Sequence, residues 1–172
     1  MTTHTTHVRP GRLEDAAAIR RLYLEVGATP GGIARTPAEI TSGYVNGFVA
    51  DSLARGIILV AELPGMAELA GELHAYRSDL EVFTHVMGDL TVAVHPRAQG
   101  QGIGRQLFNR LLDEVKRHHP DVTRVELITQ EGNVRALHLY ESLGFRREGR
   151  LEGRIRAPNG GFEADIPMAW CR

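Results

Sequence analysis

Cysteine is nearly absent from this sequence, and long apolar runs are absent altogether. The single cysteine, Cys171, has no partner for an internal disulfide, which is typical of proteins from a reducing compartment. No window approaches the run of about eighteen apolar residues that spans a membrane, and the polar start MTTHTTHVRPG lacks the apolar core of a signal peptide. We therefore expect a soluble, cytoplasmic protein that does not contact a membrane.

An excess of charge of one sign is also lacking. The 20 Lys and Arg residues nearly balance the 21 Asp and Glu residues, for a net charge of -1. A balanced surface provides no basic field, so a nucleic-acid partner is not expected. The sequence also has no His-Glu-x-x-His motif and no paired cysteines, so no metal site is predicted. The adjacent His118 and His119 are instead expected at the solvated C-terminal end of a helix.

Length and apolar content predict the domain organisation. With 172 residues, of which 42% are hydrophobic, the chain suits one well-buried core and is short for two. We predict a polar tail over residues 1–6 and a single domain over residues 7–172. Periodicity predicts strands at 7–9, 57–62, 71–77, 86–94, 125–129, 146–156 and 162–170, and helices at 13–26, 37–53, 102–119 and 133–143. The last two strands are expected to pair antiparallel through a turn at 157–161.

The most informative segment joins an apolar strand to a helix through alternate glycines. It runs LTVAVHPRAQGQGIGRQ from Leu90 to Gln106 and places Gly100, Gly102 and Gly104 at the turn. Small residues let backbone N–H groups approach a ligand, while the following helix directs its positive end at the same point. This combination predicts a site for an anion such as a pyrophosphate.

Two known glycine-rich phosphate motifs do not match this turn. The dinucleotide fingerprint G-x-G-x-x-G would place its third glycine at Arg105, although Glu126 lies at a suitable distance downstream to bind a ribose. The phosphate loop of nucleotide hydrolases requires Gly-Lys-Ser or Gly-Lys-Thr, and neither tripeptide occurs. A purely structural turn stays an alternative at this point.

Two motifs in sequence order carry a family resemblance. The pattern QxxGxG from Gln99 to Gly104 resembles motif A of the GNAT superfamily of N-acetyltransferases, and NxxAxxLYxxxGF from Asn133 to Phe145 resembles motif B. Asn133 and Tyr140 are two helical turns apart and therefore share one helix face. The resemblance covers nearly the whole chain. It implies a mixed α/β (α+β) fold, with a mostly antiparallel central sheet of about seven strands flanked by about four helices.

The resemblance also implies a reaction: direct transfer of an acetyl group from the co-substrate acetyl-CoA to a primary amine, without a metal. The residues implied to bind the pyrophosphate are Gln99, Gly100, Gln101, Gly102, Ile103, Gly104 and Arg105, with Arg97 as a further charge. A backbone N–H at Val92, Ala93 or Val94 would polarise the thioester carbonyl. Tyr140 would be the general acid for the leaving thiolate. Asn133 would bind the pantetheine arm or an ordered water, and a helix-capping role is compatible with this.

The attacking amine must be neutral, which raises the question of a base. Deprotonating a lysine-like amine at neutral pH costs about 4 to 5 kcal/mol, against about 1 to 1.5 kcal/mol for an α-amine. The candidates are Glu72, His74, Asp89 and Glu126. Glu72 is predicted as the base, with a water chain as the alternative.

The acceptor is predicted partly from what the chain lacks. Some family members carry a strand glutamate five residues before the motif B asparagine, where this chain has Ile128. This difference disfavours N-terminal acetylation of a ribosomal protein. We expect a small-molecule amine, such as an amino acid, a polyamine or an antibiotic. The alternatives are a protein N-terminal or lysine acetyltransferase and an acyl-CoA-binding regulatory module without turnover. Exposed edges of the C-terminal strands favour a homodimer.

Overall fold

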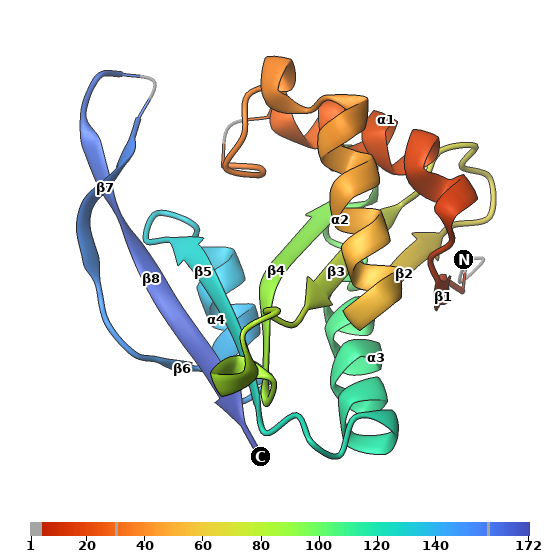
Figure 1. Ribbon diagram of the computed structural model, residues 1–172. Coiled ribbons are helices and arrows are strands. Elements are labelled where there is room, and N and C mark those ends of the chain that lie inside the picture. Colours follow the sequence, from red (N-terminus) through yellow and green to blue (C-terminus); the bar gives the residue numbers. More distant parts are fainter. Residues whose placement is uncertain (1–4, 30, 158) are drawn as a thin grey trace.

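A computed structural model describes residues 5–29, 31–157 and 159–172 of the chain. Residues 1–4 of the predicted tail, and Pro30 and Pro158 of two predicted loops, lie outside the described residues. The strands are β1 (His7–Pro10), β2 (Gly56–Glu62), β3 (Gly71–Tyr76), β4 (Val86–Val94), β5 (Arg124–Gln130), β6 (Arg146–Arg147), β7 (Leu151–Arg156) and β8 (Phe162–Cys171) (Figure 1). The α-helices are α1 (Ala16–Gly27), α2 (Ser42–Arg55), α3 (Ile103–His118) and α4 (Val134–Ser142).

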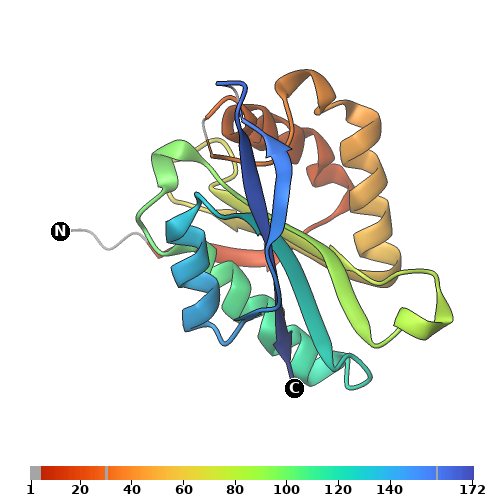
Figure 2. The same ribbon diagram turned by 90° about the vertical axis from the view of Figure 1, so that its left-hand side faces the viewer.

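One sheet organises the fold, with its strands in the order β1-β2-β3-β4-β5-β8-β6 and β7 paired to β8. Every pairing is antiparallel except that of β4 with β5. Helices α1 and α2 cover one face, and α3 and α4 lie on the other (Figure 2). The mixed, mostly antiparallel architecture inferred from the sequence is confirmed, with eight strands in place of about seven.

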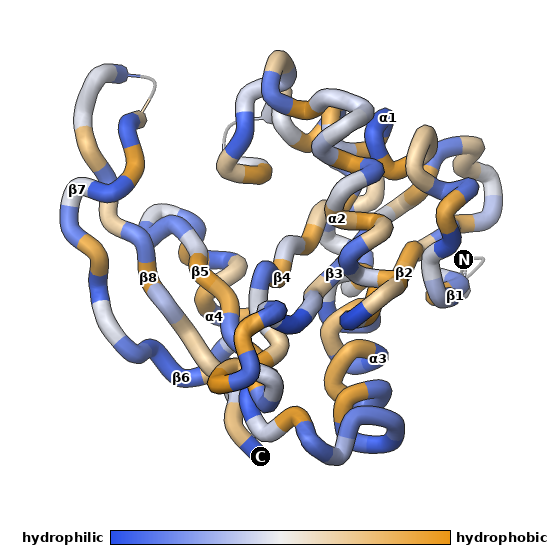
Figure 3. The backbone as a smooth tube through the Cα atoms, in the orientation of Figure 1, coloured by the Kyte–Doolittle hydropathy of each residue, from blue (hydrophilic) through white to orange (hydrophobic). Residues whose placement is uncertain are grey.

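The two helical layers are held by strand residues that alternate between the faces. On β2, Ile58 and Val60 pack with α1 and α2, whereas Leu59 and Ala61 pack with α3. A strand buried on both sides reads as a continuous apolar run, which explains the sequence IILVA in this strand. Helix α3 is apolar along one side and polar along the other (Figure 3). The core is therefore divided into one cluster on each face of the sheet.

Two predicted boundaries are wrong for identifiable reasons. The predicted helix over 37–53 is interrupted. A 3-10 turn at Pro37–Glu39 is followed by Ile40, and α2 begins only after Thr41. Thr41 caps α2, because its side chain accepts a hydrogen bond from the backbone N of Tyr44 at 3.1 Å. The predicted strand over 146–156 is split into β6 and β7 opposite Pro167 of β8. The carbonyl of Pro167 accepts from the N–H of Glu148 at 2.9 Å, but a proline has no N–H to return the bond, so the ladder breaks there and resumes at Leu151.

The sheet opens between β4 and β5. These strands pair only at Val86 with Arg124 and at Met87 with Val125, and then diverge (Figure 1). Just beyond that point the register of β3 with β4 shifts between His74 and Tyr76, which marks a bulge. Asp89 lies in the bulge with a φ of 47°, in the left-handed region that non-glycine residues rarely occupy. The opening and the bulge thus coincide at the middle of the sheet.

The described helices include none that is both long and apolar enough to cross a bilayer. The single domain predicted over residues 7–172 and the predicted homodimer stay predictions.

The α3 and α4 layer depends on Phe108, which is 0% exposed. Its ring lies 5.1 Å from that of Tyr140 and 5.8 Å from that of Phe145 between centroids. We expect Phe108→Ala to lower the free energy of unfolding by about 3 to 5 kcal/mol, because a buried ring is lost and a cavity is left. The matched control is Phe162→Ala, at a ring that is 64% exposed, with an expected change below about 0.5 kcal/mol. Urea unfolding of both variants measures the difference; similar losses would contradict the packing account.

Candidate functional site

The glycine turn forms an open cradle of backbone N–H groups. Gly100 and Gly102 have φ values of 82° and 78°, and Gly102 is the N-cap of α3 without a side chain that caps it. The first backbone bond of the helix runs from the N–H of Gln106 to the carbonyl of Gly102 at 3.1 Å. Within the described part of the chain, the N–H groups of residues 100–105 have no backbone or side-chain acceptor. Unpaired donors at a helix N-terminus suit an anion.

The cradle lies against the end of β4 and against α4. A Cβ atom at Gly104 would lie 3.4 Å from Cδ2 of Leu139 and 3.9 Å from Cγ2 of Val94. Nearby, the guanidinium of Arg105 donates to the hydroxyl of Ser142 at 2.8 Å. The two stretches that resemble motifs A and B are therefore in direct contact, although they are far apart in the sequence.

Polar side chains of the turn stabilise the loop itself. The amide nitrogens of Gln99 and Gln101 donate to the carbonyls of Val94 at 3.4 Å and Arg97 at 3.3 Å. Arg97 pairs with Glu68 at 2.8 Å on the surface. Exposed ion pairs of this kind contribute about 0 to 1 kcal/mol, so a phosphate can compete for the guanidinium. The phosphate roles inferred for these side chains stay predictions.

The predicted carbonyl-binding segment of β4 lies in the opening of the sheet. Val92, Ala93 and Val94 pair with β3 on one side and have no partner on the side of β5. Val92 and Val94 are half-buried on the α3 face, where Leu139 is half-buried as well, whereas Ala93 is buried toward α1 and α2. Main-chain groups on the unpaired edge are available to a ligand.

Tyr140, the predicted general acid, lies on α4 within an aromatic cluster. It is 6% exposed and packs against Phe108 and Phe145. Its hydroxyl has no hydrogen-bond partner among the described residues. Every fully buried polar side-chain atom of these residues does have a partner, so the hydroxyl of Tyr140 must reach the surface. Burial disfavours the phenolate and raises the pKa of Tyr140 to about 12. The side chain therefore stays protonated at neutral pH.

Asn133 has a structural role that the sequence left open. It caps α4, because its Oδ1 accepts a hydrogen bond from the backbone N of Ala136 at 3.2 Å. The predicted contact with a pantetheine arm would use the remaining amide group, and it stays a prediction.

A buried polar cluster lies on the opposite face of the sheet. The hydroxyl of Tyr23, on α1, donates to Oε2 of Glu72 at 2.6 Å, and Nδ1 of His74 lies 3.0 Å from Oε1 of the same carboxylate. Glu72 and His74 are 0% and 2% exposed. Burial and the neighbouring Glu72 raise the pKa of Tyr23 well above its usual value. The structure thus brings two of the predicted base candidates together.

The other two base candidates lie near the bulge. Asp89 is exposed on it, and the Glu126 side chain lies beside Gly88, where a Cβ would be 3.4 Å from Oε1. Glu126 also accepts from Nε of Arg124 at 2.8 Å.

Tyr23 and the aromatic residues around the cluster were not predicted as site residues. Tyr23 falls within the helix predicted over residues 13–26, and it contacts a residue 49 positions away. Phe48 stacks on His74 with 4.0 Å between ring centroids and 12° between planes. Arg35 lies 3.9 Å above the ring of Tyr44. The one signal available in the sequence was the hydroxyl of Tyr23 among the apolar residues of its helix.

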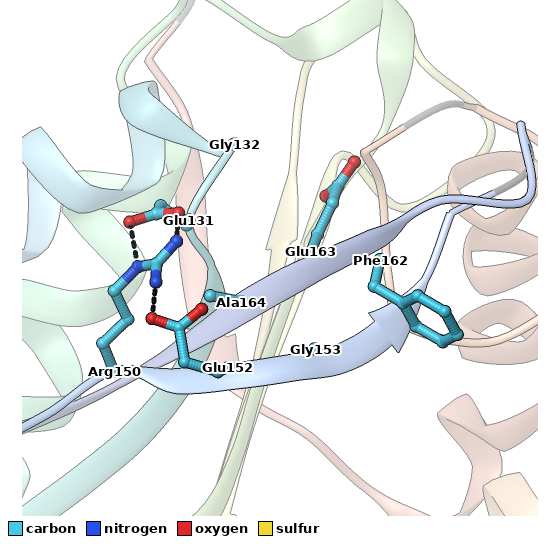
Figure 4. Close-up of a pocket in the computed structure, with 8 residues that line it drawn as sticks. All are labelled: Glu131, Gly132, Arg150, Glu152, Gly153, Phe162, Glu163 and Ala164. Carbon is cyan, nitrogen blue, oxygen red and sulfur yellow. Dashed lines mark hydrogen bonds and ion pairs between the residues drawn. The ribbon is translucent and has the colours of Figure 1, made fainter.

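A separate cavity of about 430 Å³ lies between the β7–β8 hairpin and the turn after β5 (Figure 4). Arg150 binds both oxygens of Glu131, at 2.6 and 2.7 Å, and also pairs with Glu152. The remaining lining residues are Gly132, Gly153, Phe162, Glu163 and Ala164. The charges of Arg150, Glu131 and Glu152 are paired with one another, so the cavity gives no indication of a particular ligand.

The described residues hold no group of three His, Cys, Asp or Glu side chains arranged around a metal position. The predicted pair His118 and His119 does end α3, but only His118 is exposed, in contact with Glu114 at 2.6 Å. His119 is half-buried beside Arg77 at 3.1 Å, and burial lowers its pKa.

Comparisons with known proteins identify the family of this chain. Residues 43–145 match the family model of the Acetyltransferase (GNAT) family. The L-amino acid N-acyltransferase MnaT of Escherichia coli is 32% identical over 138 residues, which are 80% of this chain and 78% of that protein. The L-methionine sulfoximine/L-methionine sulfone acetyltransferase of Salmonella typhimurium is 30% identical over 131 residues, or 76% and 74% of the two chains. The chain belongs to the GNAT family and is an acyltransferase.

A solved structure supports the fold. YncA from Salmonella typhimurium, determined with acetyl-CoA, superposes with a TM-score of 0.83 at 22% identity, covering 97% of this chain and 94% of that chain. The family inferred from the two motifs is therefore confirmed, and acetyl-CoA is the co-substrate that the family uses.

If Tyr140 protonates the leaving thiolate, its hydroxyl matters to turnover more than to binding. We expect Tyr140→Phe to lower kcat by about 100-fold or more, while the Kd for acetyl-CoA and the unfolding midpoint stay unchanged because the ring is kept. Steady-state kinetics and calorimetry measure the two effects. Equal losses of turnover and of acetyl-CoA affinity would assign Tyr140 to structure instead.

Proposed function

We propose that this protein transfers an acetyl group from acetyl-CoA to the primary amine of a small amino-acid-like molecule, directly within a ternary complex. The observation that carries the proposal is the open N–H cradle at the start of α3, next to the unpaired edge of β4 and to the hydroxyl of Tyr140. These three features provide an anion site, groups that can hold a carbonyl and a proton donor in contacting segments.

Each part of the co-substrate has a proposed contact in this site. The pyrophosphate would bind the N–H groups of residues 100–105, beside the side chain of Gln99, and Asn133 would contact the pantetheine arm. A backbone N–H within Val92–Val94 would hold the thioester oxygen as it gains negative charge. Tyr140 would protonate the departing sulfur, in keeping with the high pKa that burial gives it.

The acceptor class is proposed from a cation beside the buried cluster. Arg35 stacks on Tyr44, whose ring centroid lies 6.5 Å from that of Tyr23, and no carboxylate pairs with Arg35 among the described residues. A guanidinium of this kind is suited to the carboxylate of an amino acid. The amine of the same molecule would then point toward Glu72 and His74. Two relatives are named for amino acids or their analogues, which supports this class.

The decisive experiment combines binding and turnover. We expect calorimetry to detect acetyl-CoA binding, and pooled L-amino acids to release free thiol from it in the presence of the protein. Absence of binding at millimolar acetyl-CoA would contradict the proposal. Binding without thiol release across amino acids, polyamines and protein substrates would instead identify a regulatory module, and release with proteins alone would identify a protein acetyltransferase.

Arg35 should discriminate between acceptors. We expect Arg35→Gln to raise the KM for the amino acid by about 10- to 100-fold, because a charge-assisted contact is lost. The KM for the corresponding amine, which has the same side chain but no carboxylate, should change little. Arg21→Gln, at an exposed arginine on α1, is the matched control. A similar loss with both acceptors, or in both variants, would remove Arg35 from carboxylate recognition.

A further inference from the structure

Tyr23, Glu72 and His74 form a buried, hydrogen-bonded polar cluster where apolar side chains would suffice for packing. We infer that Nε2 of His74 takes the proton from the acceptor amine, and that Glu72 and Tyr23 are positioning residues for this imidazole. The inference rests on the proposed function and assigns the base of the same reaction. Both oxygens of Glu72 are already engaged, by the hydroxyl of Tyr23 at 2.6 Å and by Nδ1 of His74 at 3.0 Å, so this carboxylate is not free to take a proton from an amine.

Hydrogen bonding sets which ring nitrogen is free to accept a proton. A carboxylate only accepts hydrogen bonds, so the two oxygens of Glu72 require donors. The hydroxyl of Tyr23 supplies one at 2.6 Å, and the nitrogen 3.0 Å from the other oxygen is Nδ1 of His74. The proton of a neutral imidazole therefore lies on Nδ1, and Nε2 carries the lone pair.

Two aromatic rings fix the plane of the imidazole. Phe48 from α2 stacks on the imidazole at 4.0 Å, and Tyr76 lies parallel to it at 6.2 Å. Nε2 has no hydrogen-bond partner among the described residues. Because every fully buried polar side-chain atom of these residues has a partner, Nε2 is not fully buried and reaches solvent. The ring thus lies between aromatic neighbours, and Nε2 is its nitrogen without a protein partner.

His74 lies beside the point where the sheet parts. His74 pairs with Thr91 of β4, and the register shift that marks the bulge lies between His74 and Tyr76. Thr91 directly precedes Val92, the first residue of the segment proposed to hold the thioester carbonyl. An amine at Nε2 is therefore adjacent to the strand that positions the acetyl group.

The surroundings of His74 include several titratable or charged groups. They are Tyr23 from α1, Arg35 from the following loop, Tyr44 from α2, and Glu72 and Tyr76 from β3. Only Glu72 is both in contact with the ring and able to offset an imidazolium charge.

The competing carboxylates are less suited to the task. Glu126 is engaged by the guanidinium of Arg124 at 2.8 Å. A carboxylate held by a guanidinium has a lone pair already occupied. Asp89 is exposed on the bulge and has no partner in the described structure that orients it.

The proton inventory of the reaction balances with these groups. The ammonium gives one proton to Nε2, and the neutral amine nitrogen forms the C–N bond to the thioester carbon. The C–S bond breaks, and the sulfur takes the proton of the Tyr140 hydroxyl. The second N–H proton leaves the nitrogen and restores Tyr140, directly or through water. The imidazolium discharges to solvent, so an ammonium and acetyl-CoA give the amide, CoA thiol and one proton.

The test compares variants of the full chain with an amino acid that releases thiol. We expect His74→Gln to lower kcat/KM by about 100-fold or more and to remove the acidic limb of the pH–rate profile, with unchanged acetyl-CoA binding by calorimetry. We expect Glu72→Gln to lower kcat/KM less and to shift that limb, because the imidazolium loses its counter-charge. His118→Gln, an exposed histidine on α3, is the matched control and should leave rate and profile unchanged.

Two further measurements keep the inference falsifiable if His74→Gln folds poorly. His74→Ala should be rescued by added imidazole, which fits the space left beside Phe48. Glu126→Gln should retain the acidic limb. Loss of the limb in Glu126→Gln, or a full rate in His74→Gln, would overturn the assignment. A wild-type protein that releases no thiol would instead overturn the proposed function, so the two failures are distinguishable.

Discussion

The early end of the β4–β5 pairing determines where the sheet can admit a ligand. A parallel pair that stops after Met87 and Val125 leaves the remaining edge of β4 without a strand partner. Main-chain groups in the interior of a fold need partners, so this edge is suited to a ligand that can supply them. The chain leaves β4 directly into the glycine turn and α3. The unpaired edge and the anion cradle are therefore positioned by one continuous segment.

The sheet also separates the two halves of the proposed chemistry. Tyr140 belongs to the α3 and α4 face, and His74 belongs to the α1 and α2 face. Proton donation to sulfur and proton removal from nitrogen are thus assigned to opposite faces of the same opening. Two groups with opposite tasks need different environments, which two separate cores provide. Burial keeps the phenol protonated, whereas a carboxylate contact orients the imidazole.

The sequence predicted local structure well and long-range contacts poorly. The glycine turn, the two motifs and most elements are governed by residues close in the chain, and they lie where periodicity and turn chemistry placed them. The start of α2 was missed because Thr41 competes with Pro37 as the helix-starting signal. The split between β6 and β7 depends on Pro167, which lies in the partner strand. The Tyr23 contact depends on the packing of a helix on a strand, which periodicity alone does not encode.

Pro167 has a consequence for how such a protein can change over time. On one side, β8 forms an uninterrupted register with β5 from Arg124 to Gln130. On its other side, the ladder is broken into the short β6 and the longer β7. The hairpin beyond the break can accept insertions or altered turns without displacing β5. The surface formed by the hairpin can therefore diversify while β5 keeps its register with β8 and its place beside β4.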